Sequence, residues 1–448
     1  MLKSRDGFFK EVLKIALPVT LQALLQSSFS VVDQIMTGQL GSTSVAGIGL
    51  GGKFSNVYSV LVSAVATVTG IMIAQYLGQG EHKKVSRSFF VNMLIAVGTA
   101  VVFTLISVIF AADIMSLYTG DALTCNAAAG YLRILAIEFV PMAAVLLIST
   151  LLRCIGAAAL PLYASICAAV VNTGLNYILI FGKLGFPALG VNGAAIATVI
   201  AQFVNGIIVL ILFIRYLRKM NHECKLEFTL RMERTEQKQY LKMLLPILAC
   251  EFLWVLGENV YTAIYGNMGT MPCAAMTLTV PIQILVIGAL SGVSQAAGVI
   301  IGKTLGYGAY DRAYTESKKL MQYGVIGSAV LSVVLLIGCR YYVMIYQVED
   351  YVRHLTTQLI IVYAIISPVK VQNMILSGGI IRSGGKTNYV MYIDMIGTWL
   401  FGVPLGLLAA FVWKLDIPYV YFILSLEECV RLGISWMIFR KRKWMISL

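Results

Sequence analysis

One acidic residue stands out because it lies inside an apolar stretch of the sequence. The stretch runs from Leu17 to Gly41 and reads LPVTLQALLQSSFSVVDQIMTGQLG, with Asp33 near its end. Ionisable side chains are rare in membrane helices, where they mark ion or substrate paths. A carboxylate near the C-terminal end of a helix also gains nothing from the helix dipole, which is negative there. We therefore expect Asp33 to be a functional acid that can exchange protons, and the alternative is a buried hydrogen-bonded acid that holds helices together.

The composition shows what kind of structure must position this acid. The 448 residues are 59% hydrophobic and 12% charged, against about 25% charged in soluble domains. Apolar runs of about 20 residues cross a bilayer as helices, whereas barrel strands are only about 10 residues long. We predict an all-α polytopic membrane protein with twelve transmembrane helices. The predicted spans are residues 8–37, 44–77, 88–111, 128–152, 160–182, 192–216, 239–267, 273–304, 314–341, 352–381, 387–412 and 417–440.

An internal repeat divides the spans into two halves of six. The matched landmarks are Leu17-Pro18 with Leu245-Pro246, Gly38 and Gly41 with Gly266 and Gly269, and Leu77-Gly78-Gln79-Gly80 with Leu305-Gly306-Tyr307-Gly308, all offset by 228 residues, then Pro141 with Pro368 at 227 and Arg153 and Gly156 with Arg382 and Gly385 at 229. Halves with an even number of spans insert the same way up, which predicts two lobes related by a pseudo-twofold axis along the membrane normal. We place an N-lobe at 1–216, a cytoplasmic linker at 217–238 and a C-lobe at 239–448.

Lys and Arg are distributed unevenly between the two sides of the predicted membrane. Of the 34, 26 fall on the side that holds both termini and five on the opposite side. Because Lys and Arg gather in cytoplasmic loops, we predict a multi-pass protein of the plasma (inner) membrane with both termini in the cytoplasm. The net charge of +13 follows from this topology, and it gives no reason to expect a nucleic-acid partner.

Several segments together resemble the multidrug and toxic compound extrusion (MATE) family. They are the LP…VVDQIMTGQLG opening with its later LP…NMG echo, LGQG after the second span, YLRI at 131–134, NTGLNYILIFG at 172–182 and VNGAAIAT at 191–198. The resemblance covers essentially the whole chain. It implies a twelve-helix, two-lobed antiporter, not an enzyme, that exports organic and often cationic compounds by using a sodium or proton gradient. We expect a monomer that needs no cofactor besides this coupling ion.

The resemblance also implies a set of coupling residues. Asp33 matches the family's N-lobe coupling-ion aspartate, and Asn172, Asn176 and Thr198 match the side chains around it. Asn172 and Asn176 are spaced i, i+4 and so share one helix face. The family often has aspartate where this chain has Asn176, so a sodium ion at Asp33 would be bound by fewer charges and by amide and hydroxyl oxygens. For Thr198, helix packing is an equal alternative.

The second half offers a separate set of candidates in its first helix. Glu251, Glu258 and Tyr261 in that helix are candidates for contact with substrate or a second cation, and Gln34, next to Asp33 in the first half, is a weaker one. The two glutamates are seven residues apart and so lie on nearly the same helix face, while Tyr261 stands where the repeat would place a second Asp33. The alternative for either glutamate is a buried pair with Lys370.

Other membrane charges carry less information. Glu427 and Glu428 precede Arg431 by three or four residues, the spacing of a local ion pair within a helix. Asp394 has no role that its spacing suggests.

These features predict alternating access, in which uptake of a proton or sodium ion at Asp33 drives release of an amphipathic substrate. Pro18 removes a backbone hydrogen bond from the first helix and so permits a bend there. Two alternatives stay open: a flippase for a lipid-linked saccharide or precursor, and, less favoured, a membrane-embedded transferase.

Overall fold

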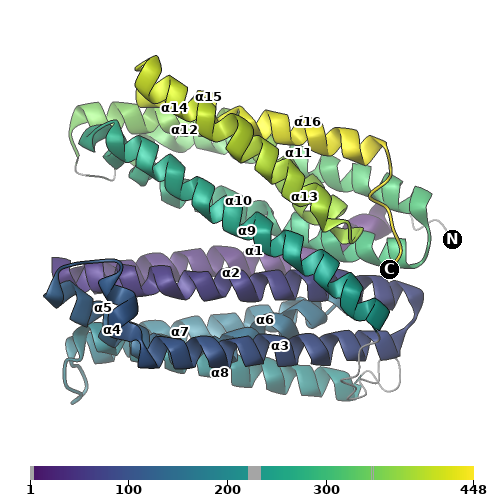
Figure 1. Cartoon of the computed structure of the whole chain (residues 1–448), viewed down its shortest axis with the longest axis horizontal. Coiled ribbons are helices and arrows are strands. Elements are labelled where there is room, and N and C mark those ends of the chain that lie inside the picture. Colours follow the sequence, from purple (N-terminus) through teal and green to yellow (C-terminus); the bar gives the residue numbers. More distant parts are fainter. Residues whose placement is uncertain (1–4, 220–233, 345, 347) are drawn as a thin grey trace. The chain divides into compact units, whose positions relative to one another are not determined.

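The computed structural model describes residues 5–219, 234–344, 346 and 348–448. In these ranges the chain forms helices joined by short turns, and no strand (Figure 1). Among the described residues, eleven helical stretches are long and apolar enough to cross a membrane. The predicted all-α membrane architecture is confirmed.

The helices of the first half follow the predicted spans. They are α1 (Arg5–Thr37), α2 (Ser42–Gln79), α3 (His82–Ile109), α4 (Ala111–Ser116), α5 (Ala122–Leu135), α6 (Phe139–Cys154), α7 (Ala159–Phe181) and α8 (Gly190–Lys219). A 3-10 turn, Ala136–Glu138, joins α5 to α6, so the two make one span. The short α4 was not predicted. It is six residues long, too short for a periodic pattern to show in the sequence.

The helices of the second half are more often interrupted. They are α9 (Arg234–Asn267), α10 (Thr270–Gly306), α11 (Tyr310–Met344), α12 (Asp350–Asn373), α13 (Thr387–Asp394), α14 (Val403–Leu407), α15 (Ile417–Ser425) and α16 (Glu427–Arg440). Wider π-helical segments extend α12, α13 and α14, at Met374–Ile381, Met395–Gly402 and Leu408–Val412 respectively. The twelfth predicted span is made by α15 and α16, which are separated at Leu426, and each is too short to cross a bilayer alone.

Two pairs of the repeated glycines have similar φ angles in both halves. Gly80 and Gly308 have φ angles of 76° and 72°, and Gly156 and Gly385 have 85° and 75°. Residues with a side chain rarely adopt these angles, so glycine is needed to make each turn. The repeat seen in the sequence therefore marks turns of the same geometry.

The chain packs into two compact units. Unit 1 comprises Met1–Thr20, Ala74–Gly80 and Thr235–Leu448, and unit 2 comprises Leu21–Ile73 and Glu81–Arg234. In unit 2, α7 packs along α8 and α3 along α6; in unit 1, α10 packs against α11 and α12 (Figure 1). The lobe boundaries drawn from the repeat stay a prediction, and most of the linker at 217–238 lies outside the described residues.

Glycines allow the unit 1 ends of α1 and α2 to lie very close to α10. A side chain at Gly292 would collide with the backbone oxygen of Ala16, and one at Gly306 would collide with that of Gln75. The Thr20 hydroxyl also donates to the carbonyl oxygen of Ala289 at 3.1 Å. Helix α1 is thus held to unit 1 up to Thr20, and its unit 2 part begins at Leu21.

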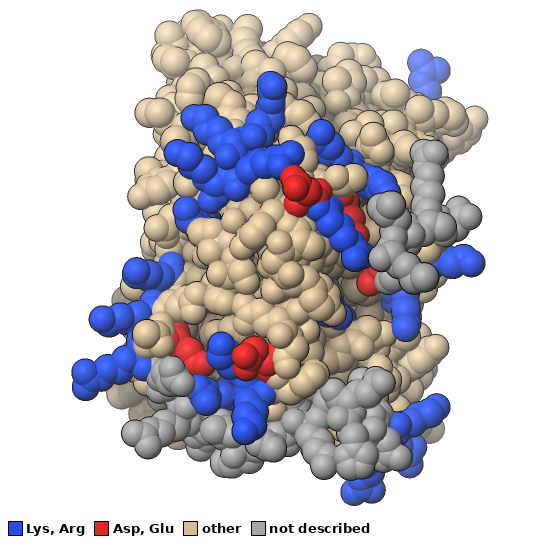
Figure 2. Space-filling view, turned by 90° about the vertical axis from the view of Figure 1, so that its right-hand side faces the viewer, with Lys and Arg blue, Asp and Glu red and all other residues tan. Residues whose placement is uncertain are grey.

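Basic side chains occupy the last turns of several helices. Among them are Arg218 and Lys219 in α8, Lys303 in α10 and Arg440 in α16. The face drawn in Figure 2 carries many Lys and Arg side chains and few Asp and Glu. The membrane orientation was predicted from the uneven distribution of Lys and Arg along the sequence. The cytoplasmic position of the termini stays a prediction.

Candidate functional site

Asp33 lies in the last turns of α1, four residues before the helix ends at Thr37. Its carboxylate oxygen Oδ1 accepts a hydrogen bond of 2.7 Å from Nδ2 of Asn176. The same Asn176 nitrogen lies 3.1 Å from Oδ1 of Asn172, one turn earlier on α7. Both asparagines are buried and Asp33 is half-buried. The structure therefore brings the acid and the two amides together inside unit 2.

Thr198 joins this group through Asn172. Its hydroxyl oxygen lies 3.4 Å from Nδ2 of Asn172 and donates to the carbonyl oxygen of Ala194 at 3.0 Å. It reaches Asn172 because α7 and α8 pack along each other. All four predicted coupling residues thus lie together, contributed by α1, α7 and α8. Their role as an ion site stays a prediction.

The side-chain amide of Asn172 can be placed beside Asp33 in either of two orientations. With the amide oxygen toward Asp33, the oxygen lies 2.9 and 3.1 Å from the two carboxylate oxygens. Such a contact between acceptors is favourable only when the carboxyl group carries a proton or when a cation lies between the oxygens. With the amide turned over, its nitrogen donates to both carboxylate oxygens, which suits the ionised acid.

One further acceptor is available at the site. The side-chain oxygen of Asn176 is buried and has no hydrogen-bond partner in the described part of the chain. Buried polar atoms are normally paired with protein, water or an ion. Hard cations take oxygen ligands, and the oxygens of Asp33, Asn172, Asn176 and Thr198 provide a set of that kind.

Two other candidates lie on the same helix. Gln34 is exposed beside Asp33, pointing about 100° away around the helix. Pro18 lies inside α1 three residues before Leu21, where the part of α1 that belongs to unit 2 begins. Proline leaves the carbonyl four residues earlier without its helical hydrogen bond. The helix is nevertheless continuous, and the bend at Pro18 stays a prediction.

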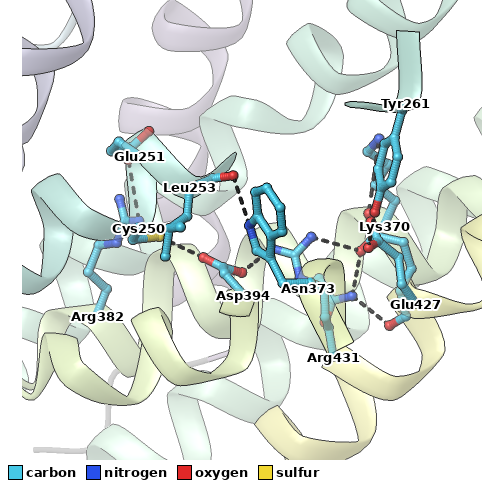
Figure 3. Close-up of polar contacts among 12 residues, drawn as sticks. Cys250, Glu251, Leu253, Tyr261, Lys370, Asn373, Arg382, Asp394, Glu427 and Arg431 are labelled. Atoms are coloured by element: carbon cyan, nitrogen blue, oxygen red, sulfur yellow. Dashed lines mark hydrogen bonds and ion pairs between the residues drawn. The ribbon is translucent and has the colours of Figure 1, made fainter. Parts of the chain in front are cut away.

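The candidates of the second half lie in unit 1, where Figure 3 shows their polar contacts. Glu251 forms an ion pair of 3.5 Å with Arg382. Glu258 is exposed and lines two cavities. The Tyr261 hydroxyl lies 2.5 Å from Oε2 of Glu427, to which it donates.

A buried charge network in unit 1 was only partly anticipated. Arg431 on α16 pairs with Asp394 on α13 and with Glu428 at 3.6 Å (Figure 3). The predicted local ion pair is thus confirmed for Glu428, whereas the hydrogen bond from Tyr261 engages Glu427. Lys370 lies 4.0 Å from Glu428 and does not pair with Glu251 or Glu258. The sequence showed these charges inside apolar spans, but contacts between distant helices leave no local signal.

Two neighbouring cavities adjoin this network. They measure about 170 and 200 Å³ and share the side chains of Glu258, Tyr363, Lys370, Glu427 and Glu428. The smaller is further lined by Tyr261, Tyr265 and Tyr421, and the larger by Asn373, Ser377 and Arg431. Unit 1 therefore contains a partly open space with acidic, aromatic and basic walls.

Comparison with known proteins decides the family. The MatE family model matches residues 18–178 and 246–408, one match in each half of the repeat. The chain belongs to the MatE family. The resemblance drawn from the sequence motifs is thereby confirmed, and the chain is a transporter-family protein embedded in a membrane.

Relatives and solved structures agree over nearly the full length. An uncharacterized transporter YisQ of Bacillus subtilis is 23% identical over 96% of this chain and 93% of its own length. A probable multidrug resistance protein NorM of Thermotoga maritima is 23% identical over 97% of this chain and 93% of its own. A crystal structure of MATE in complex with MaL6 has a TM-score of 0.88 at 16% identity, covering 97% of this chain and 96% of that one. The solved structures show the MatE fold.

Proposed function

We propose that this chain is a secondary active antiporter that exports organic, cationic or amphipathic compounds in exchange for a proton or sodium ion. The observation that carries the proposal is the Asp33 site in unit 2. An ionisable carboxyl group is held there by Asn176 and faces Asn172, whose amide matches a different state of the acid in each orientation. The multidrug resistance relatives support the substrate class.

The coupling step uses the side chains of unit 2. When Asp33 takes up a proton, it can donate to the amide oxygen of Asn172, whose nitrogen then donates to Thr198. When Asp33 is ionised, the Asn172 nitrogen turns to the carboxylate, and the amide oxygen can accept from the Thr198 hydroxyl. Binding of the ion thus rearranges contacts among α1, α7 and α8.

In the proposed transport step, this rearrangement changes the access of substrate to its binding site. Helix α1 belongs to unit 1 up to Thr20 and to unit 2 from Leu21 onward. Because Pro18 weakens the helix close to that boundary, a shift of α1 at Asp33 can bend the helix there and change access to the substrate. We further propose a monomer in the plasma membrane with cytoplasmic termini. The multidrug resistance relatives do not favour the flippase alternative.

The test is transport of a fluorescent organic cation into or out of proteoliposomes under separately imposed proton and sodium gradients. For one-to-one exchange, a pH difference of one unit sustains a substrate gradient of about tenfold. We expect Asp33→Asn to reduce that gradient to about the passive level, because asparagine cannot exchange a proton. Asp113→Asn is the matched control, since Asp113 is exposed on α4 of the same unit.

The response to the two gradients also identifies the coupling ion. Transport driven by the sodium gradient at constant pH assigns sodium, and transport driven by the proton gradient without sodium assigns the proton. Full gradient-driven transport by Asp33→Asn would contradict the coupling role of Asp33.

A further inference from the structure

The charges around the two cavities of unit 1 do not balance. Asp394, Glu427 and Glu428 are buried, with 8%, 6% and 5% of their surface exposed. Two cations pair with them, Arg431 and Lys370. A third, Arg382, lines the larger cavity but pairs with Glu251. When all three acids are ionised, one negative charge remains without a counter-charge.

The two cations are held very differently. Arg431 forms ion pairs with both Asp394 and Glu428 and is 14% exposed. Lys370 is 32% exposed, and its ammonium group reaches only to 4.0 Å from Glu428. That distance is longer than a hydrogen bond, and lysine carries its charge on a flexible four-carbon chain. Arg431 is therefore a fixed part of the network, whereas the Lys370 ammonium can leave it.

The walls around Lys370 offer groups that a second cation would bind. The Asn373 oxygen Oδ1 and the Ser377 hydroxyl line the larger cavity, are buried, and have no hydrogen-bond partner among the described residues. The Asn373 nitrogen already donates to Glu428 at 2.8 Å, which leaves its oxygen free to face the positive charge of a bound cation. These two side chains are buried polar groups that a bound molecule would satisfy.

The aromatic wall of the smaller cavity indicates the chemical class of that molecule. Tyr261, Tyr265, Tyr363 and Tyr421 contribute to it together with Glu258 and Glu427. Aromatic faces combined with carboxylates attract organic ammonium ions, through the ring quadrupole and through charge. A compact organic ammonium fits these walls.

We propose that Lys370 is a tethered cation that occupies this ammonium site of unit 1 and competes with bound cations for it. An organic ammonium binds beside Glu427 and Glu428 only when the Lys370 side chain withdraws. Lys370 thereby sets the affinity for cationic substrates. The proposal rests on the proposed export of organic cations, and it concerns a site separate from Asp33.

The test measures binding without any gradient, so that coupling does not enter. Full-length protein carrying Asp33→Asn is placed in nanodiscs and titrated with tetraethylammonium by calorimetry at constant pH. The probe has a permanent charge. The Asp33→Asn background removes the carboxylate of the proposed ion site in unit 2, so that the probe cannot bind to it. In this background we expect Lys370→Met to bind the probe about tenfold more tightly, because a like charge close to the bound probe is removed.

A double variant separates charge from a change of shape. Lys370→Met combined with Glu428→Gln removes one charge of each sign, so the net charge of the network is as before. We expect its affinity to return to about that of the Asp33→Asn parent. Lys370→Arg keeps the charge and should also bind like the parent.

A matched control excludes a general effect of removing a lysine. Lys386 lies 5.6 Å from the Tyr389 ring, outside the cavity walls, so Lys386→Met should leave affinity unchanged. Lys370→Gln serves as the second single variant if Lys370→Met does not fold, as judged by thermal unfolding. Unchanged or weaker binding in the folded single variants, absent binding throughout, or an equal gain in Lys386→Met would overturn the proposal. None of these outcomes bears on gradient-driven transport at Asp33.

Discussion

Arg431 is the residue on which the buried acids of unit 1 most depend. It is 14% exposed and pairs with both Asp394 and Glu428. Removing one partner from a buried ion pair leaves an uncompensated charge, which costs about 3–5 kcal/mol. We expect Arg431→Met to lower the free energy of unfolding by about this amount, measured by thermal or denaturant unfolding in detergent.

An exposed ion pair in the same unit is the control. Arg353 pairs with Asp350 at 3.1 Å, where the aspartate side chain is 97% exposed. Exposed pairs contribute about 0–1 kcal/mol, so Arg353→Met should change stability little. Equal losses in the two variants would show that burial of the Arg431 network does not determine its contribution.

At the scale of residues, the polar group around Asp33 in unit 2 could be predicted from the sequence, whereas the charge network around Arg431 in unit 1 could be predicted only in part. Asn172 and Asn176 could be placed on one helix face by their spacing, and the family resemblance placed Asp33 beside them. The pair of Asp394 and Arg431 could not be predicted, because these residues are 37 positions apart and meet only after α13 and α16 pack together. Such contacts depend on how the helices pack, which cannot be predicted from local spacing or from composition.

At the scale of elements, the close crossing of α2 and α10 depends on the absence of a side chain at Gly306. A Cβ atom there would collide with the backbone oxygen of Gln75, which cannot rotate away as a side chain would. We expect Gly306→Ala to destabilise the protein by about 1–3 kcal/mol. Thermal unfolding of the purified variant measures the loss.

Another glycine of the same helix provides the comparison. A Cβ at Gly298 would come no closer than 3.8 Å to Gly379, an ordinary contact. Alanine is also the better helix former by about 1 kcal/mol, so Gly298→Ala should be neutral or stabilising. A stable Gly306→Ala variant would mean that α2 and α10 can separate at this crossing without cost.

The helix boundaries, too, could be predicted only in part from the sequence. Hydropathy located the long spans because their lengths follow from the thickness of a bilayer. It did not reveal the break at Leu426 or the π-helical segments, since apolar composition does not depend on how a helix is wound.

At the scale of the whole molecule, the uneven distribution of Lys and Arg predicts which loops face the cytoplasm. Leu184, between α7 and α8, and Tyr307, between α10 and α11, are 80% and 71% exposed. After replacement of the native cysteines, we expect Leu184→Cys in intact cells to react with an impermeant thiol reagent. Tyr307→Cys should react only after permeabilisation. The reverse pattern would invert the proposed orientation.

The two halves share a frame but not its polar residues. Tyr261 replaces Asp33 at the offset of 228 residues, and Glu427 replaces Thr198 at the offset of 229. Tyr261 donates to Glu427, so in unit 1 the hydroxyl lies on the first helix and the acid on the last. The carboxyl group and the hydroxyl have exchanged helices between the halves.

The π-helical segment Met374–Ile381 accommodates two residues that the first half lacks. It lies between Pro368 and Arg382, which are two residues further apart than Pro141 and Arg153, their counterparts around the regular α6. A π-helix holds more residues in each turn than an α-helix, so extra residues fit without a longer span or a new loop. The two extra residues of the second half are accommodated by the wider turns of this segment. Deleting one residue there would turn Arg382 by about 100° about the axis and separate it from Glu251.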